Sequence, residues 1–162
     1  MKRIAKFEKI SYEQFAKDFG ENSKAVYDDI KLPKRATIGS AGYDFFAPEG
    51  FSLKAGETIK VPTGIRVKMD ESWVLNIYPR SGLGFKYRLA LDNTVGIIDS
   101  DYYNSSNEGH IMIKITNNSL EGKMVEVEKG IAFAQGIFLE YGITVDDDAD
   151  GVRDGGFGST TA

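Results

Sequence analysis

Short apolar runs with a period of two, each ended by turn residues, occupy most of this 162-residue chain. The clearest are SWVLNIYP at 72–79, GHIMIKITN at 109–117, MVEVEKG at 124–130, FAQGIFLE at 133–140 and GITV at 142–145. Turn-forming stretches such as APEG, KAGE, VPTG, SGLG and NNSLEG separate runs of this kind. Such alternation is typical of strands with one buried face. Many short strands joined by turns predict an all-β sandwich or barrel.

One short helix is expected near the N-terminus, over about residues 11–19. Ser11 followed by Gln14 resembles a capping box at a helix start, and Gly20 follows the last helical residue. Four side chains between them fall on one helical face: Tyr12, Phe15, Ala16 and Phe19. This region therefore predicts an amphipathic helix that packs against the strands.

The length of the chain suits one domain, which we place at residues 1–151. The acidic run DDDADG at 146–151 indicates a hinge before the segment 152–162, and from Arg153 onward this segment offers only one large apolar side chain, Phe157, for burial. Its glycines and hydroxyls can approach an anion closely. We expect 152–162 to act as a mobile lid that orders on a phosphate.

The composition excludes several kinds of chemistry. The chain has no cysteine and one histidine, His110, which argues against disulfides, thiolate nucleophiles, a Ser–His–Asp triad and a zinc site. The net charge of −4 argues against nucleic acid or an anionic membrane surface as a partner. With no apparent secretory signal or membrane span, a cytoplasmic protein is expected. Any acid–base catalysis would use carboxylates, with a hard metal such as Mg²⁺.

Five stretches place polar groups beside apolar strand sequence: AGYDFFAP at 41–48, YPRSGLGFK at 78–86, LDNTVGIIDSDYYNSSNEGHI at 91–111, GIAFAQGIF at 130–138 and RDGGFGST at 153–160. Each of the first four alone is more simply explained as a structural loop or turn, and the last as a frayed terminus. Together, in this order, they resemble the five motifs of the trimeric dUTP pyrophosphatases over about residues 36–161. PRSG, GIIDSDY and GGFGST are the most specific of these matches.

The resemblance implies a distorted β jelly roll that assembles as a homotrimer, with active sites at subunit interfaces. It implies hydrolysis of dUTP to dUMP and pyrophosphate with Mg²⁺, which would keep uracil out of DNA and supply dUMP for dTMP synthesis. Asp99 would deprotonate the water that attacks the α-phosphorus. Asn93 would bind the Watson–Crick edge of uracil, and Tyr102 would pack on the deoxyribose and exclude a 2′-hydroxyl.

The same resemblance assigns the phosphate and metal contacts. Asp44 would accept hydrogen bonds from waters on Mg²⁺ without ligating it directly, and Phe157 would stack on the uracil. The other substrate-binding residues implied are Arg80, Ser81, Gly82, Gln135, Arg153, Gly158, Ser159 and Thr160.

The chain departs from the family pattern at three places. Ala132 stands where many members have an arginine, the tail has one residue between Arg153 and Gly155 where many have two, and residues 103–108 form an insertion whose composition suits an exposed loop. Two alternatives stay open at this point. One is a dCTP deaminase-like enzyme on the same fold, and the other is a regulatory module that binds a protein through the N-terminal helix or the insertion.

Overall fold

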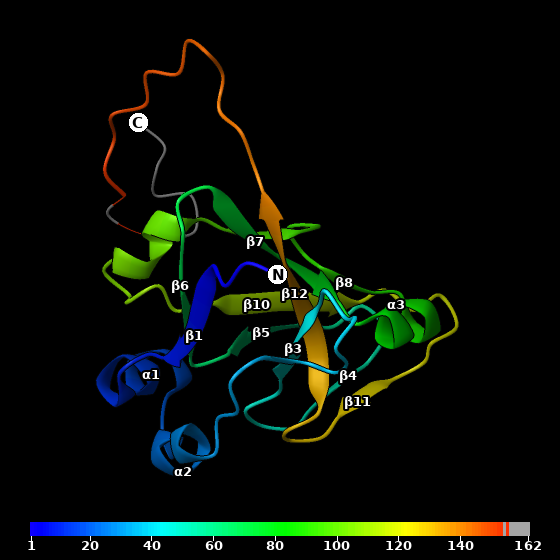
Figure 1. The fold of residues 1–162 in the computed structure, drawn as a ribbon. Coiled ribbons are helices and arrows are strands. Elements are labelled where there is room, and N and C mark those ends of the chain that lie inside the picture. The colour runs from blue at the N-terminus through cyan, green and yellow to red at the C-terminus, as the bar shows by residue number, and fades with distance from the viewer. Residues whose placement is uncertain (154, 156–162) are drawn as a thin grey trace.

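The computed structural model describes residues 1–153 and 155, and short antiparallel strands make up most of its regular structure (Figure 1). Within these residues the largest sheet has five strands in the order β2–β3–β12–β7–β9. In that order its strands are Lys34–Arg35, Tyr43–Phe46, Ala132–Glu140, Trp73–Pro79 and Gly96–Ile98. Strand β7 lies inside this sheet, with β12 on one side and β9 on the other.

Smaller sheets complete the β domain. Strands β5 (Thr58–Pro62), β10 (Met112–Asn117) and β8 (Leu89–Leu91) pair in that order, β11 (Val125–Val127) pairs with β4 (Phe51–Leu53), and β1 (Ala5–Lys9) pairs with β6 (Ile65–Met69). The sheets enclose one apolar core, because each strand turns alternate side chains inward. The largest fully buried side chains include Phe15, Phe45, Phe133, Leu75, Ile77, Ile113 and Ile115.

The predicted N-terminal helix is confirmed as α1 (Tyr12–Phe19). Its N-cap is Ser11, whose hydroxyl accepts a hydrogen bond from the Gln14 amide at 3.1 Å. Phe15 is fully buried and fastens this helix to the core. The strands predicted at 72–79, 109–117, 124–130 and 133–140 are found as β7, β10, β11 and β12.

Other elements differ from the sequence-based expectation. The GITV segment is not a strand, and Ile143 and Val145 stay exposed because no strand pairs with them among the described residues. The SGLG turn is the start of α3 (Ser81–Tyr87), which leaves β7 at Arg80. Helix α2 (Ser23–Asp28), the 3₁₀ helix η1 (Ser100–Asn104) and strand β1 were not predicted, because each is too short for a periodic pattern.

The insertion at 103–108 is only partly the exposed loop that its composition suggested, since Asn104 and Ser106 are exposed but its other residues are buried or half-buried. Ser105 is buried, and its hydroxyl donates to the Tyr102 carbonyl at 2.7 Å. Gly109 follows the insertion with φ +72°, and a Cβ there would lie 2.7 Å from the Tyr102 carbonyl oxygen. The segment turns inward because these polar groups are paired within the loop. None of the described helices is long and apolar enough to cross a membrane.

Gly109→Ala should destabilise the protein by about 2–5 kcal/mol, because a left-handed residue with a Cβ is strained and the clash is with backbone. Gly56→Ala is the matched control. Gly56 also has positive φ, at +86°, but a Cβ there meets nothing within 4 Å, so only about 1–2 kcal/mol should be lost. Urea unfolding at one protein concentration measures both. Equal losses would show that Gly109 is not sterically required.

Candidate functional site

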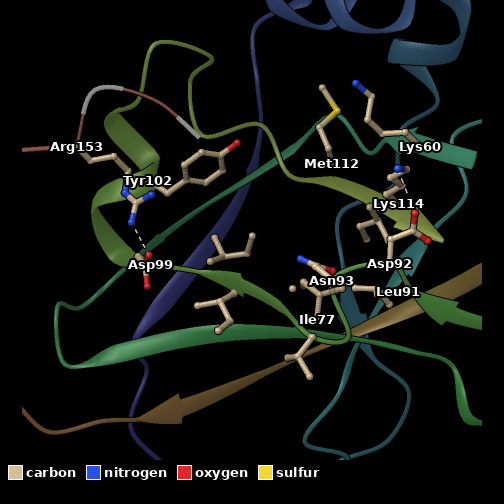
Figure 2. Close-up of a pocket in the computed structure, with 15 residues that line it drawn as sticks. Lys60, Ile77, Leu91, Asp92, Asn93, Asp99, Tyr102, Met112, Lys114 and Arg153 are labelled. Carbon is tan, nitrogen blue, oxygen red and sulfur yellow. Dashed lines mark hydrogen bonds and ion pairs between the residues drawn. The ribbon is translucent and has the colours of Figure 1, made fainter. Parts of the chain in front are cut away.

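A cavity of about 540 Å³ opens between the β8–β9 connection, η1 and β10. This volume is in the range of small-molecule sites. Its apolar lining includes Val95, Ile98 and Met112. Figure 2 shows Asp99, Tyr102 and Arg153 on one side of the cavity and Asn93 on the other, with Lys60 and Lys114 near the Met112 edge.

The turn between β8 and β9 presents Asn93 and backbone groups to this cavity. Strand β8 ends at Leu91 and β9 begins at Gly96, so the intervening turn carries Asn93 at an exposed position. The turn is tight: the Thr94 amide donates to the Leu91 carbonyl at 3.0 Å, and Thr94 has φ 69°. An amide side chain and free backbone groups at one turn can pair with the polar edge of a planar ring.

Asp99 stands at the end of β9, where the chain leaves the sheet. It is the N-cap of η1 with an extended backbone (φ −79°, ψ 157°), and its carbonyl accepts from the Tyr102 amide at 3.2 Å. The apolar strand GII thus delivers a half-exposed carboxylate to the cavity rim.

Arg153 reaches this carboxylate from the C-terminal segment. Its Nη2 lies 2.5 Å from Asp99 Oδ2 (Figure 2). Its Nε lies 2.8 Å from Asp101 Oδ1, so Asp101 is the second partner of this guanidinium. In the free chain the cavity's carboxylate is neutralised by an arginine that also suits phosphate oxygens.

Tyr102 forms a fixed wall of the cavity. Its hydroxyl donates to the His110 carbonyl at 2.8 Å and accepts from Asn107 Nδ2 at 2.8 Å. The residue is buried, and this burial raises the pKa of the phenol. With both ends of the side chain held, the ring has little freedom to make room for a bulkier ligand.

A second group of predicted residues gathers elsewhere on the same sheet. Arg80 Nη1 lies 2.5 Å from Asp44 Oδ1, and Gln135 pairs with Asp44 across the β12–β3 ladder. The Gln135 amide donates to the Pro79 carbonyl at 3.2 Å, so it braces the bend between β7 and α3. Ser81 and Gly82, at the start of α3, are exposed.

These two groups lie at opposite ends of β7. Leu75 pairs with Ile98, so Asp99 is level with Val74 near the start of β7, whereas Arg80 follows its last residue. Six residues of strand span roughly 20 Å. One chain therefore does not bring Asp99 and Arg80 to the same phosphate group.

Other predicted residues cannot be placed. Phe157, Gly158, Ser159 and Thr160 lie outside the described residues. Sequence reasoning gave no site role to Asn107 or His110, although both hold the Tyr102 hydroxyl. No periodicity or motif marked these contacts, because they depend on how the 103–110 loop folds back. The described residues contain no cluster of three or more metal-ligating side chains.

Comparison with known proteins gives a consistent set of relatives. The dUTPase family model matches residues 28–161. A deoxyuridine 5′-triphosphate nucleotidohydrolase from Lactococcus lactis is 43% identical over 137 residues, covering 82% of this chain and 89% of that protein. One from Shigella flexneri is 38% identical over 141 residues, covering 82% and 88%.

Solved structures agree with this fold. The Streptococcus mutans dUTPase superposes with a TM-score of 0.65 at 34% identity, covering 87% of this chain and 98% of that one. A mutant dUTPase from phage phi11 of S. aureus, solved to show the coordination of a structural Mg(II) ion, has a TM-score of 0.65 at 20% identity, covering 92% and 98%. The short antiparallel strands seen here are thus those of the distorted jelly roll predicted from the motifs.

The His110 imidazole beneath Tyr102 should make the fold acid-sensitive. Burial lowers the pKa of His110 below its ordinary 6.5, so the unfolded chain binds a proton that the folded chain does not. The contribution of neutral His110 to the free energy of unfolding is therefore fully present above pH 6.5. It is lost as the pH drops from 6.5 toward the pKa of His110 in the folded protein, by at most about 1.4 kcal/mol per pH unit.

An NMR titration of this single imidazole, beside thermal unfolding at pH 7.5 and 5.5, checks the prediction. The neighbouring Glu108 has a pKa lowered from 4.5, so it titrates below the pH range of this experiment. A midpoint at or above 6.5 would contradict the argument.

Proposed function

The chain belongs to the dUTPase family, and from that premise we propose that it hydrolyses dUTP to dUMP and pyrophosphate, with Asp99 as the general base. One observation carries the proposal. Asp99 lies at the rim of a nucleoside-sized cavity that has Asn93 in the opposite turn and Tyr102 as a fixed wall. Base, sugar and attacking water thus each have a place along this one cavity.

Uracil recognition would fall to the β8–β9 turn. The Asn93 amide offers a donor and an acceptor, and the backbone of this turn adds others. Cytosine reverses part of this pattern and would leave buried polar groups unpaired, which rejects dCTP. The pinned Tyr102 ring would exclude a 2′-hydroxyl and so reject UTP.

In the reaction, Asp99 would take a proton from water as the water oxygen bonds to the α-phosphorus. The bond from that phosphorus to the bridging oxygen breaks, and pyrophosphate leaves. Arg153 must first release Asp99, because its guanidinium occupies the Asp99 Oδ2 that would take the proton. The triphosphate would provide the competing oxygens, so substrate binding frees the base at the same step.

The second group would bind phosphate and metal. Arg80, Ser81, Gly82 and Gln135 offer guanidinium, hydroxyl and amide donors for phosphate oxygens. Asp44 offers the hard oxygen that suits a water on Mg²⁺, provided that it shares its Arg80 contact. Bound to the triphosphate, Mg²⁺ would offset part of the phosphate charge.

The separation of the two groups along β7 supports a homotrimer with sites between subunits. A site that needs both Asp99 and Arg80 would take them from different subunits. The segment 152–162 would close over it, with Phe157 on the base and Arg153, Gly158, Ser159 and Thr160 on the phosphates. We place this activity in the cytoplasm, where dUTP removal protects DNA and yields dUMP for dTMP synthesis.

Asp99→Asn should retain the fold and nucleotide affinity but lose about 10²–10⁴-fold in turnover, since the amide cannot accept the proton. Asp101→Asn is the matched control, because it removes the other carboxylate partner of Arg153 and leaves Asp99 in place. Its turnover should stay within a few-fold of wild type. Pyrophosphate release from dUTP is the measurement, and near-normal release by folded Asp99→Asn would remove Asp99 from the mechanism.

Mixing Asp99→Asn with Arg80→Ala should restore activity that neither variant has alone. In randomly mixed trimers, roughly a quarter of interface sites would combine an intact Asp99 from one chain with an intact Arg80 from another. Light scattering should show a mass of about three chains. If the variants demonstrably exchange subunits and no activity returns, the two groups do not meet across an interface.

A further inference from the structure

The N-terminal segment precedes the part of the chain that matches the family. That match begins at residue 28, whereas β1, α1 and most of α2 lie before it. We call residues 4–27 the N-terminal extension. In Figure 1 it is the blue chain, and its strand β1 lies along β6 in the register Ala5–Met69 to Lys9–Ile65. It is therefore part of the folded domain.

The extension makes three polar contacts with the loop 103–110, which directly follows Tyr102. The Tyr103 hydroxyl donates to Glu8 Oε2 at 2.7 Å. Glu108 accepts from the Ser11 amide at 2.7 Å and from its hydroxyl at 2.6 Å. In α1, Asp18 Oδ2 lies 2.6 Å from His110 Nδ1. Each contact joins one element of the extension to one position of the loop.

The Glu108 contact is built into the helix start. Glu108 occupies the place on the Ser11 amide that a capping-box side chain would fill, and Gln14 turns its amide to Asp18 instead, at 2.8 Å. The helix is thus capped by the loop that follows the catalytic carboxylate. Folding of α1 and ordering of this loop depend on the same bond.

His110 connects the N-terminal extension to Tyr102 in the cavity wall. Its ring is fully buried, and its Nε2 accepts from the Gly64 amide at 2.8 Å, which assigns the proton to Nδ1. Nδ1–H therefore donates to Asp18. The carbonyl of the same residue accepts the Tyr102 hydroxyl. The position of Tyr102 thus depends on a residue anchored to the core on one side and to the extension on the other.

Arg66 of β6 also holds the loop 103–110. The Arg66 guanidinium lies 3.6 Å from the centre of the Tyr103 ring, and its Nη2 donates to the Tyr103 carbonyl at 2.7 Å. Tyr103 is therefore clamped between β6 and Glu8 of β1. The N-terminal helix and the insertion were the two candidate surfaces for a regulatory partner. Several of their polar groups instead bond to each other.

We propose that the N-terminal extension is a positioning element of the nucleotide site, with Asp18 as its positioning residue. Through His110, Asp18 holds the carbonyl that fixes Tyr102, and so sharpens selection of 2′-deoxyribose over ribose. This rests on the proposed function, in which Tyr102 packs against the sugar. The extension thereby gives this chain a support for its sugar wall from outside the family-matched region.

Three variants at α1 test the role. Asp18→Ala removes the acceptor for His110 and should raise KM for dUTP about 3- to 10-fold, lower the dUTP-to-UTP ratio of kcat/KM, and change kcat little. Asp18→Asn keeps an acceptor oxygen and should retain wild-type selectivity. Glu13→Ala removes an exposed carboxylate from the same helix, one without a hydrogen bond or ion pair among the described residues, and should behave as wild type.

The single histidine gives a readout that does not depend on activity. In ¹⁵N-labelled protein, a slowly exchanging Nδ1–H signal is expected for wild type, Asp18→Asn and Glu13→Ala, and its loss for Asp18→Ala. Tyr103→Phe removes only the hydroxyl bonded to Glu8, so it tests the contacts between the N-terminal extension and the loop 103–110 even if Asp18→Ala does not fold. It should shift selectivity in the same direction by a smaller factor.

Unchanged KM and selectivity in folded Asp18→Ala and in Tyr103→Phe would overturn the inference, as would equal effects from Glu13→Ala. These outcomes differ from a failure of the proposed function. Wild-type protein that releases no pyrophosphate from dUTP would refute the activity and the sugar-selective role together. Hydrolysis by the wild type with unaltered variants refutes the positioning role alone.

Discussion

The antiparallel pairing of β7 with β12 and β9 is the constraint on which the rest of the structure depends. Leu75 and Ile77 on β7 are buried in the core, which fixes the register of the neighbouring strands. That register places Asp99 level with Val74 near one end of β7, whereas Arg80 follows the other end. The length of the strand therefore keeps these two side chains apart within one chain. Under the roles proposed for them, a neighbouring subunit would complete the site.

Both halves of the candidate site are arginine–carboxylate pairs in the free chain: Arg80 with Asp44, and Arg153 with Asp99. Each pair offsets the charge of a side chain that would otherwise lack a partner, the second pair at the cavity rim and the first at the other end of β7. A triphosphate can compete for both guanidinium groups, because its oxygens fit the same planar fork. Binding would then free Asp44 toward metal-bound water and Asp99 toward the attacking water. The two guanidinium groups that pair with carboxylates in the free chain would thus bind the substrate's phosphates.

The loop after Asp99 shows how a short apolar strand can deliver a precise wall to a cavity. Tyr102 is held at its hydroxyl by Asn107 and by the His110 carbonyl, and His110 is itself held between Gly64 and Asp18. A neutral imidazole suits this position, since one nitrogen accepts and the other donates. Protonation would leave the Gly64 amide facing a second donor. Acid sensitivity and site geometry are therefore linked at one residue.

The sequence by itself determined the all-β class, the helix at α1, the longer strands and the motif residues, because alternation, capping and motif order are local properties. It could not determine α2, β1 or the α3 helix at SGLG, which are too short to show a period. It wrongly made GITV a strand, since alternation does not provide a pairing partner. It also took all of residues 103–108 as exposed, although several of their polar side chains bond to Tyr102 or to the N-terminal segment. Tertiary structure alone decided that Asp99 and Arg80 stand apart, that Arg153 meets Asp99 and Asp101, and that Asp18 reaches His110 across 92 positions. Such contacts depend on strand register and loop closure, which join residues that no local pattern relates.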